Sequence, residues 1–237
     1  MSASKRRVAF RKWAPHVAAA IVLGSLIVWD QQAFAAVTGF RSPFLTWLTD
    51  RVSQLRGATF PSAVALLLVA IGLSLKRSAI WRAGIAVLLT VVLTGAVTTV
   101  LKVVIARPGP TPNRVLRTPK SLFDDRFGRF PSSHSAVMFG SAGAVAAFLP
   151  AAAVPAFTLA VLVCHERIYR GTHFPSDIFA GMWIGLVTAQ LVIAPLSRRK
   201  GWREDLVRAR VDRKSSDLSS LESTEEPPKV AGREPVA

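Results

Sequence analysis

The chain has 237 residues, of which 51% are hydrophobic and 19% charged, and its formal net charge is +16. Such a charge can indicate a nucleic-acid-binding protein, but the basic residues gather at the ends of apolar runs and in the tail, and no nucleic-acid-binding motif is present. We therefore expect no nucleic-acid partner. The single cysteine, Cys164, excludes an intrachain disulfide.

Acidic residues are rare in most of the chain. Only six of the 14 precede residue 197, and long apolar runs lie between them. A helix needs about 20 apolar residues to cross a bilayer. The sequence thus predicts an all-α, polytopic membrane protein with six transmembrane helices, and the bilayer as its surroundings. The expected spans are 13–29, 59–75, 83–106, 132–149, 151–168 and 174–196.

The N-terminus has two interpretations. Residues 1–12 are basic and precede the first apolar run, and Ala33-Phe34-Ala35 is typical of a signal-peptide cleavage site. Five further spans follow, so we favour an uncleaved first helix. Within 31–58, apolar residues recur at helical spacing, which predicts an amphipathic helix that either lies at the outer interface or packs against the spans.

The lysines and arginines at the span ends predict the orientation. The N-terminus, the 76–82 loop and the residues after the last span are basic and should be cytoplasmic. The 107–131 loop and the 165–174 turn then lie outside, although the first of these is itself basic. We expect a domain over 13–196 and a cytoplasmic, disordered tail over 197–237.

Three polar clusters fall on this same outer side. Lys102 and Arg107 end the third span, FPSSHS (130–135) opens the fourth, and ERIYRGTHFPSD (166–177) joins the fifth to the sixth. Ionisable residues at a membrane are costly and mark functional sites. Because bases outnumber acids here, the expected ligand is an anion, most simply a phosphate.

The residue types in these clusters suit phosphoryl transfer. Ser132 should cap the fourth helix, whose N–H groups then attract an anion. Pro175 suits a helix start, which puts His173 just before the helix and Asp177 one turn on. An aspartate on one imidazole nitrogen leaves the other free to attack phosphorus.

The remaining groups supply a proton and positive charge. His134 can protonate a leaving oxygen. Lys102 and Arg167 can neutralise phosphate oxygens. Positioning and charge account for most phosphoryl-transfer catalysis, so the chemistry demands no metal and no cofactor.

In order and spacing, the three clusters resemble the motifs of the type 2 phosphatidic acid phosphatase family, membrane relatives of vanadium haloperoxidases. The family's third motif aligns from Arg167 through His173 to Asp177, and its second aligns with Pro131-Ser132-Ser133-His134. Its first, a lysine, six residues, arginine and proline, aligns from Lys102 to Pro110. The resemblance covers roughly residues 15–196.

The resemblance implies a metal-independent lipid phosphatase of the cytoplasmic membrane with an outward-facing site. His173 would form a phosphohistidine, oriented by Asp177, with His134 as the general acid. The phosphate would be held by Lys102, Arg107, Ser132, Ser133 and Arg167. The first-choice substrate is undecaprenyl diphosphate, and the alternatives are phosphatidic acid and phosphatidylglycerol phosphate.

Three positions depart from the family's pattern. Gly109 stands where an arginine is expected, and Arg107, Arg114 or Arg117 would have to supply that charge. Ser133 replaces a glycine, and Glu166 replaces the serine before Arg167. Glu166 must turn away from the phosphate or pair with an arginine. A rival hypothesis is therefore a lipid-phosphate-binding protein with impaired catalysis.

Overall fold

A computed structural model describes residues 3–55, 57–110, 128–197 and 215, and these residues form helices without any strand. The first of two compact units ends at Ser197. Apart from Ser197, which ends α7, and Ser215, the expected disordered tail over 197–237 lies outside the described residues, as do Arg114 and Arg117. In chain order the α-helices are α1 (Ala3–Gly39), α2 (Pro43–Val52), α3 (Thr59–Ser74), α4 (Ser78–Ile105), α5 (Ser133–Phe148), α6 (Ala153–Tyr169) and α7 (Pro175–Ser197), with short 3₁₀ turns at Ser53–Leu55 and Pro150–Ala152.

All six expected spans coincide with a helix, and the segment 31–58 contains the helix α2. The length and apolarity of α1, α4, α7 and α6 with its preceding 3₁₀ turn allow these four to cross a membrane. A fifth is added if α2 and α3, which meet at a 57° bend, count as one span. With 16 residues each, α3 and α5 are shorter than a typical span.

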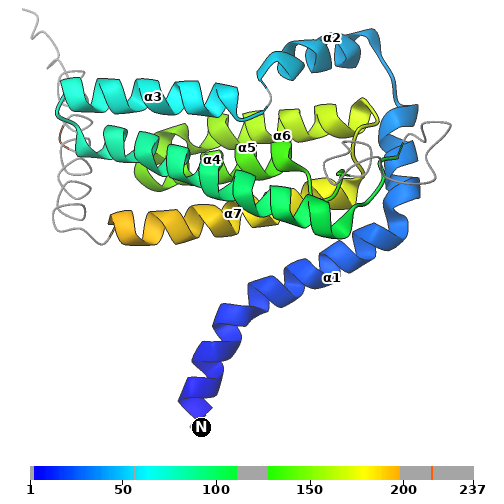
Figure 1. The fold of residues 1–237 in the computed structure, drawn as a ribbon, viewed down its shortest axis with the longest axis horizontal. Coiled ribbons are helices and arrows are strands. Elements are labelled where there is room, and N and C mark those ends of the chain that lie inside the picture. Colours follow the sequence, from blue (N-terminus) through cyan, green and yellow to red (C-terminus); the bar gives the residue numbers. More distant parts are fainter. Residues whose placement is uncertain (1–2, 56, 111–127, 198–214, 216–237) are drawn as a thin grey trace, which may run out of the picture. The chain divides into compact units, whose positions relative to one another are not determined.

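The helix α5 lies at the centre of the bundle, where it packs against α4, α6 and α7 (Figure 1). Small and hydroxyl-bearing residues fill this interior. Thr94 of α4 and Thr188 of α7, for example, share a buried hydrogen bond of 2.7 Å. Large apolar side chains such as Val92 and Leu191 point outward and are exposed. Packing through small and polar residues with apolar groups outside is typical of helices in lipid.

Glycines allow α5 and α7 to approach closely. A Cβ atom on Gly181 would lie 2.3 Å from the Ser132 carbonyl oxygen, and one on Gly185 would lie 2.0 Å from that of Ala136. Neither position tolerates a side chain, because the neighbouring atom is backbone. The close crossing brings the start of α5 against the start of α7, and so joins the second and third polar clusters.

The helix α2 begins at Pro43, where the Ser42 hydroxyl accepts a hydrogen bond from the Leu45 N–H at 3.1 Å. It packs against α6, and Thr46 shares a 2.9 Å hydrogen bond with the Tyr169 hydroxyl. Val52 is buried in a core cluster with residues of α5 and α6. These contacts agree with the packing alternative for this segment.

Candidate active site

His173 lies in the short turn between α6 and α7, as the sequence predicts. Pro175 begins α7, and Asp177 follows in its first turn. The Nδ1 atom of His173 lies 3.5 Å from Oδ2 of Asp177, and the same oxygen accepts a 2.8 Å hydrogen bond from the Phe174 N–H. Both side chains are buried. The aspartate thus faces Nδ1, which leaves Nε2 as the nitrogen available for attack.

Burial decides the protonation of His173. It lowers the pKa of the imidazole below its ordinary 6.5 because the charged form loses solvation. Asp177 opposes this shift, whereas the positive charges of Lys102 and Arg167 add to it. His173 is therefore neutral near pH 7, the state that a nucleophile requires.

The start of α5 is built as expected. Ser132 is the N-cap, and its hydroxyl accepts a 3.4 Å hydrogen bond from the Ser135 N–H. The Ser132 N–H donates in turn to the Asp177 carbonyl oxygen at 3.0 Å. Ser133 and His134 form the first turn, where helical N–H groups point outward and attract anions. The structure therefore places the second and third clusters in direct contact.

Two of the expected phosphate-binding bases lie beside the histidines. Arg167, at the end of α6, is buried, and its guanidinium nitrogen lies 3.5 Å from Nε2 of His134. Its carbonyl oxygen accepts a 2.7 Å hydrogen bond from the Thr172 hydroxyl, which fixes the turn that carries His173. Lys102, near the end of α4, donates to the Gly128 carbonyl oxygen, and its charge acts on His173.

Glu166 forms ion pairs with two arginines. It is fully buried, with Oε2 3.1 Å from Nε of Arg167 and Oε1 2.9 Å from Nε of Arg170. Arg170 also forms an ion pair with Asp50 of α2. An unshielded carboxylate would repel a phosphate, but here each oxygen faces a cation. Pairing, one of the two arrangements expected for Glu166, is what the structure has.

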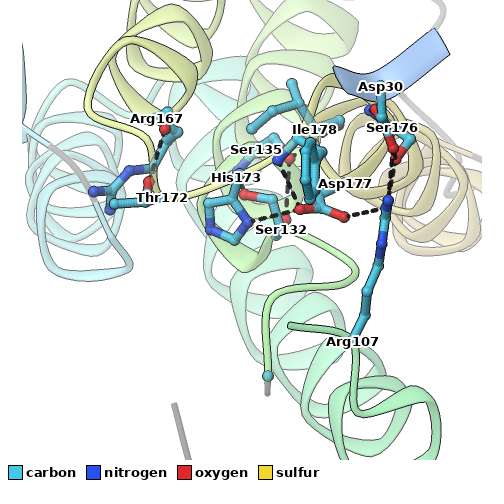
Figure 2. Close-up of polar contacts among 12 residues, drawn as sticks. Asp30, Arg107, Ser132, Ser135, Arg167, Thr172, His173, Ser176, Asp177 and Ile178 are labelled. Atoms are coloured by element: carbon cyan, nitrogen blue, oxygen red, sulfur yellow. Dashed lines mark hydrogen bonds and ion pairs between the residues drawn. The ribbon is translucent and has the colours of Figure 1, made fainter. Parts of the chain in front are cut away.

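Arg107 contacts carboxylates. One terminal nitrogen donates to Oδ1 of Asp177 at 2.8 Å and to the Ser176 hydroxyl at 2.6 Å, and the other donates to Oδ2 of Asp30 at 2.7 Å. Figure 2 shows Asp177 with His173 on one side and Arg107 on the other. Asp30, which belongs to α1, was not expected at the site. The sequence signal that points to Asp30 is a lone acid at the end of an apolar run, and the structure shows that this acid is buried.

A further unexpected residue lies at Gly109, where the motif arginine is missing. The side chain of Arg129 passes over this glycine, so that a Cβ atom there would lie 3.1 Å from Cγ and 3.4 Å from Nε of Arg129. The Arg129 N–H also donates to the Arg107 carbonyl oxygen at 3.1 Å. The glycine therefore makes room for an arginine that comes from another position in the chain.

Comparisons with known proteins identify a family and two similar structures. The family model of the PAP2 superfamily matches residues 83–200. A transmembrane PAP2 type phosphatidylglycerolphosphate phosphatase from Bacillus subtilis has a similar structure, with TM-score 0.58, 25% identity, and coverage of 82% of this chain and 98% of that one. Aquifex aeolicus LpxE is similar too, with TM-score 0.54, 23% identity, and coverage of 70% and 94%. No curated protein sequence matches the chain. The chain belongs to the PAP2 superfamily.

Proposed function

We propose that this protein removes phosphate from a membrane lipid phosphate or diphosphate through a phosphohistidine on His173. The superfamily consists of lipid phosphatases, so the enzyme class of this protein is that of a lipid phosphatase. The observation that carries the mechanism is the buried His173–Asp177 pair, 3.5 Å apart, next to the Arg167–His134 contact. It puts a neutral nucleophile, a proton donor and a cation within one small site.

In the first step, Nε2 of His173 attacks phosphorus, and the bond from phosphorus to the leaving oxygen breaks. The electron pair goes to that oxygen, which takes a proton from His134. Asp177 stabilises the imidazolium that forms. In the second step water attacks the phosphohistidine, His134 accepts a proton from the water, inorganic phosphate leaves, and His173 returns to its neutral state.

Charge on the phosphate oxygens is balanced by Lys102, Arg167 and the N–H groups at the start of α5, near Ser132 and Ser133. For Arg107 the contacts support a different role from phosphate binding, because both terminal nitrogens already meet carboxylates. Arg129 is our candidate for the missing motif arginine, since its side chain passes over Gly109.

The membrane arrangement is part of the proposal. We place six helices across the membrane, with α3 and α5 included because both pack along longer spans. Each is about 24 Å long at 1.5 Å per residue, somewhat less than the bilayer core of about 30 Å. The basic 76–82 loop supports an outward-facing site in the cytoplasmic membrane.

Two substrates have specific support. An outward site suits the recycling of a carrier lipid, which favours undecaprenyl diphosphate. Similarity to the Bacillus subtilis enzyme favours phosphatidylglycerol phosphate.

The test is phosphate release from undecaprenyl diphosphate, phosphatidylglycerol phosphate and phosphatidic acid by the full chain in detergent with EDTA. We expect release from at least one lipid, and less than about a thousandth of it from His173→Ala, since losing a nucleophile costs several powers of ten. His16→Ala is the matched control, because His16 packs on Trp183 outside the site. Binding without release would favour the rival lipid-phosphate-binding protein.

Two results would contradict parts of the scheme. Release that requires an added divalent cation would refute the metal-independent mechanism. The orientation is tested in a Cys164→Ala background with Lys120→Cys in the 107–131 loop. Labelling of intact cells by an impermeant maleimide is expected, and labelling only after permeabilisation would overturn the outward site.

A further inference from the structure

A network of buried charges lies behind His173. It joins α1, the end of α4 and the start of α7 through Asp30, Arg107, Ser176 and Asp177 (Figure 2). The side chains of Asp30 and Asp177 are 3% and 0% exposed, and that of Arg107 is 23% exposed. Two carboxylates so deeply buried need a cation between them, and Arg107 provides it.

Asp30 also caps α7 from another helix. Its Oδ1 accepts a 2.9 Å hydrogen bond from the Ser176 N–H, and its Oδ2 accepts one from the Ser176 hydroxyl. Pro175 has no N–H, so the Ser176 N–H is the first donor of the α7 segment. A carboxylate at that position satisfies the donor and interacts favourably with the helix dipole. Asp30 thus fixes the helix start from which both His173 and Asp177 are held.

Arg107 divides its charge between the two acids. Its contact with Oδ1 of Asp177 restrains the carboxylate from behind, while Oδ2 faces the Phe174 N–H and His173. The guanidinium also lies 4.8 Å from the centroid of the Phe174 ring, which limits its own movement. If Asp30 were neutral, Asp177 would be the one acid among the described residues that still pairs with Arg107.

We propose that Asp30 and Ser176 are positioning residues of the phosphatase reaction, which hold Arg107 so that Asp177 presents one carboxylate oxygen to His173. This inference rests on the proposed function. A simpler role for Asp30 would be a tether that holds α1 on the bundle. The two roles differ in what they do to His173, because a tether affects stability and leaves the histidine unchanged.

The variant Asp30→Asn separates the roles. It removes one charge and little volume, and within the part of the chain that the structure describes it leaves Asp177 as the carboxylate that pairs with Arg107. That carboxylate then offsets more of the arginine charge and stabilises the His173 imidazolium less. The charged groups that act on His173, namely Asp177 on α7, Lys102 on α4 and Arg167 on α6, are unchanged in sequence, as is His134 of α5. The pKa of His173 should therefore fall.

The experiment uses the full chain in detergent, with the imidazole titration of His173 followed by NMR. The chain has four histidines, and His173→Gln assigns the signal. In Asp30→Asn we expect a lower pKa for His173. The kcat per folded protein should fall by about tenfold to a hundredfold, because small misplacements of catalytic groups have effects of that size. KM should stay within about twofold of the wild-type value. The three lipids named above are the probes.

Two further variants test the positioning role. Asp50→Asn is the matched control, because it removes a carboxylate that pairs with an arginine, Arg170, across two other helices. It should leave the His173 titration and kcat unchanged. Ser176→Ala keeps every charge but removes the hydroxyl between Arg107 and Asp30, so kcat should fall with only a small change in the pKa of His173.

One outcome would overturn this proposal alone and make Asp30 a tether. In that outcome the wild type releases phosphate, and folded Asp30→Asn has an unchanged His173 titration and an unchanged kcat. Absence of release by the wild type from all three lipids would instead overturn the proposed function, and this proposal with it. An Asp30→Asn protein that does not fold leaves Ser176→Ala to decide, since unchanged kcat in that variant would equally refute the positioning role.

Discussion

Replacing Glu166 by glutamine should destabilise the protein and strengthen phosphate binding at the same time. The substitution keeps the shape of the side chain and removes its charge. Glu166 is 0% exposed and pairs with Arg167, whose side chain is 9% exposed, and with Arg170, which is 37% exposed. Both arginines lose an anionic partner in the variant.

The burial of each arginine sets the size of the effect. Removing one partner of a buried ion pair costs about 3–5 kcal/mol, and Arg167 is the buried partner of Glu166. Arg170 contributes little, because solvent screens exposed pairs to about 1 kcal/mol or less. Glutamine can still accept a hydrogen bond, so we expect the lower end, about 3 kcal/mol. In a chain of this length that corresponds to a fall in Tm of about 6–12 °C.

The measurement is thermal unfolding of the purified protein in one detergent, followed by tryptophan fluorescence. Asp50→Asn is the control, because its carboxylate side chain is 61% exposed and also pairs with Arg170. Its Tm should fall by no more than about 2–4 °C, the equivalent of 1 kcal/mol. Equal shifts in the two variants would show that the burial of Glu166 does not determine its contribution.

Activity provides the second readout. Without the Glu166 charge, the positive charge of Arg167 is no longer offset, and a phosphate near His134 should be bound more tightly. We expect KM to fall several-fold in Glu166→Gln, in the direction opposite to stability. A rise in KM would mean that Glu166 matters more for holding Arg167 in position than for offsetting its positive charge.

Further predictions concern other parts of the site and bundle. Because the pKa of His173 in the free protein lies below 6.5, the acid limb of kcat/KM should have its midpoint below that pH. Stability should fall as the pH drops through 6.5, where the unfolded chain binds a proton that the folded chain does not, and Tm between about pH 7 and 5.5 should fall less in His173→Gln. Gly185→Ala should lower stability by about 3 kcal/mol in thermal unfolding, the upper end of the usual cost of overpacking, whereas Gly143→Ala, where a Cβ atom meets nothing closer than 3.5 Å, should not. Arg129→Ala should raise KM about tenfold, the equivalent of one charge-assisted hydrogen bond, while Arg51→Ala on the exposed face of α2 should leave it unchanged.

Helix positions could be predicted because apolar runs and turn residues are local signals. The ends of the expected spans 59–75 and 132–149 lie within one residue of the ends of α3 and α5. The first span was too short: α1 extends from Ala3 to Gly39, beyond the apolar run at both ends. Hydropathy marks the part of a helix that suits lipid, whereas charged residues continue a helix without breaking its hydrogen bonds.

The local geometry of His173 and Asp177 could also be predicted, because proline at the start of a helix fixes the register of the next turn. Pairing between distant side chains could not. Glu166 is a case of closer pairing: Arg170 lies four residues on, and the two side chains meet because α6 continues as far as Tyr169. The direction of Arg107 depends on a carboxylate 77 residues earlier, and no spacing within the motif indicates it.

Asp30 shows what kind of signal was nevertheless present. It is one of six acids in the first 196 residues, and it directly follows the first apolar run. An acid at such a place is costly unless it meets a cation or the N–H groups of a helix start, and Asp30 meets both, at Arg107 and at Ser176. Ala33 to Ala35 continue α1 beyond it, and Phe34 packs on Phe174 at 5.7 Å between ring centroids. Cleavage after Ala35 would remove the residue that caps α7 and balances Arg107, so these contacts favour an uncleaved first helix on physical grounds.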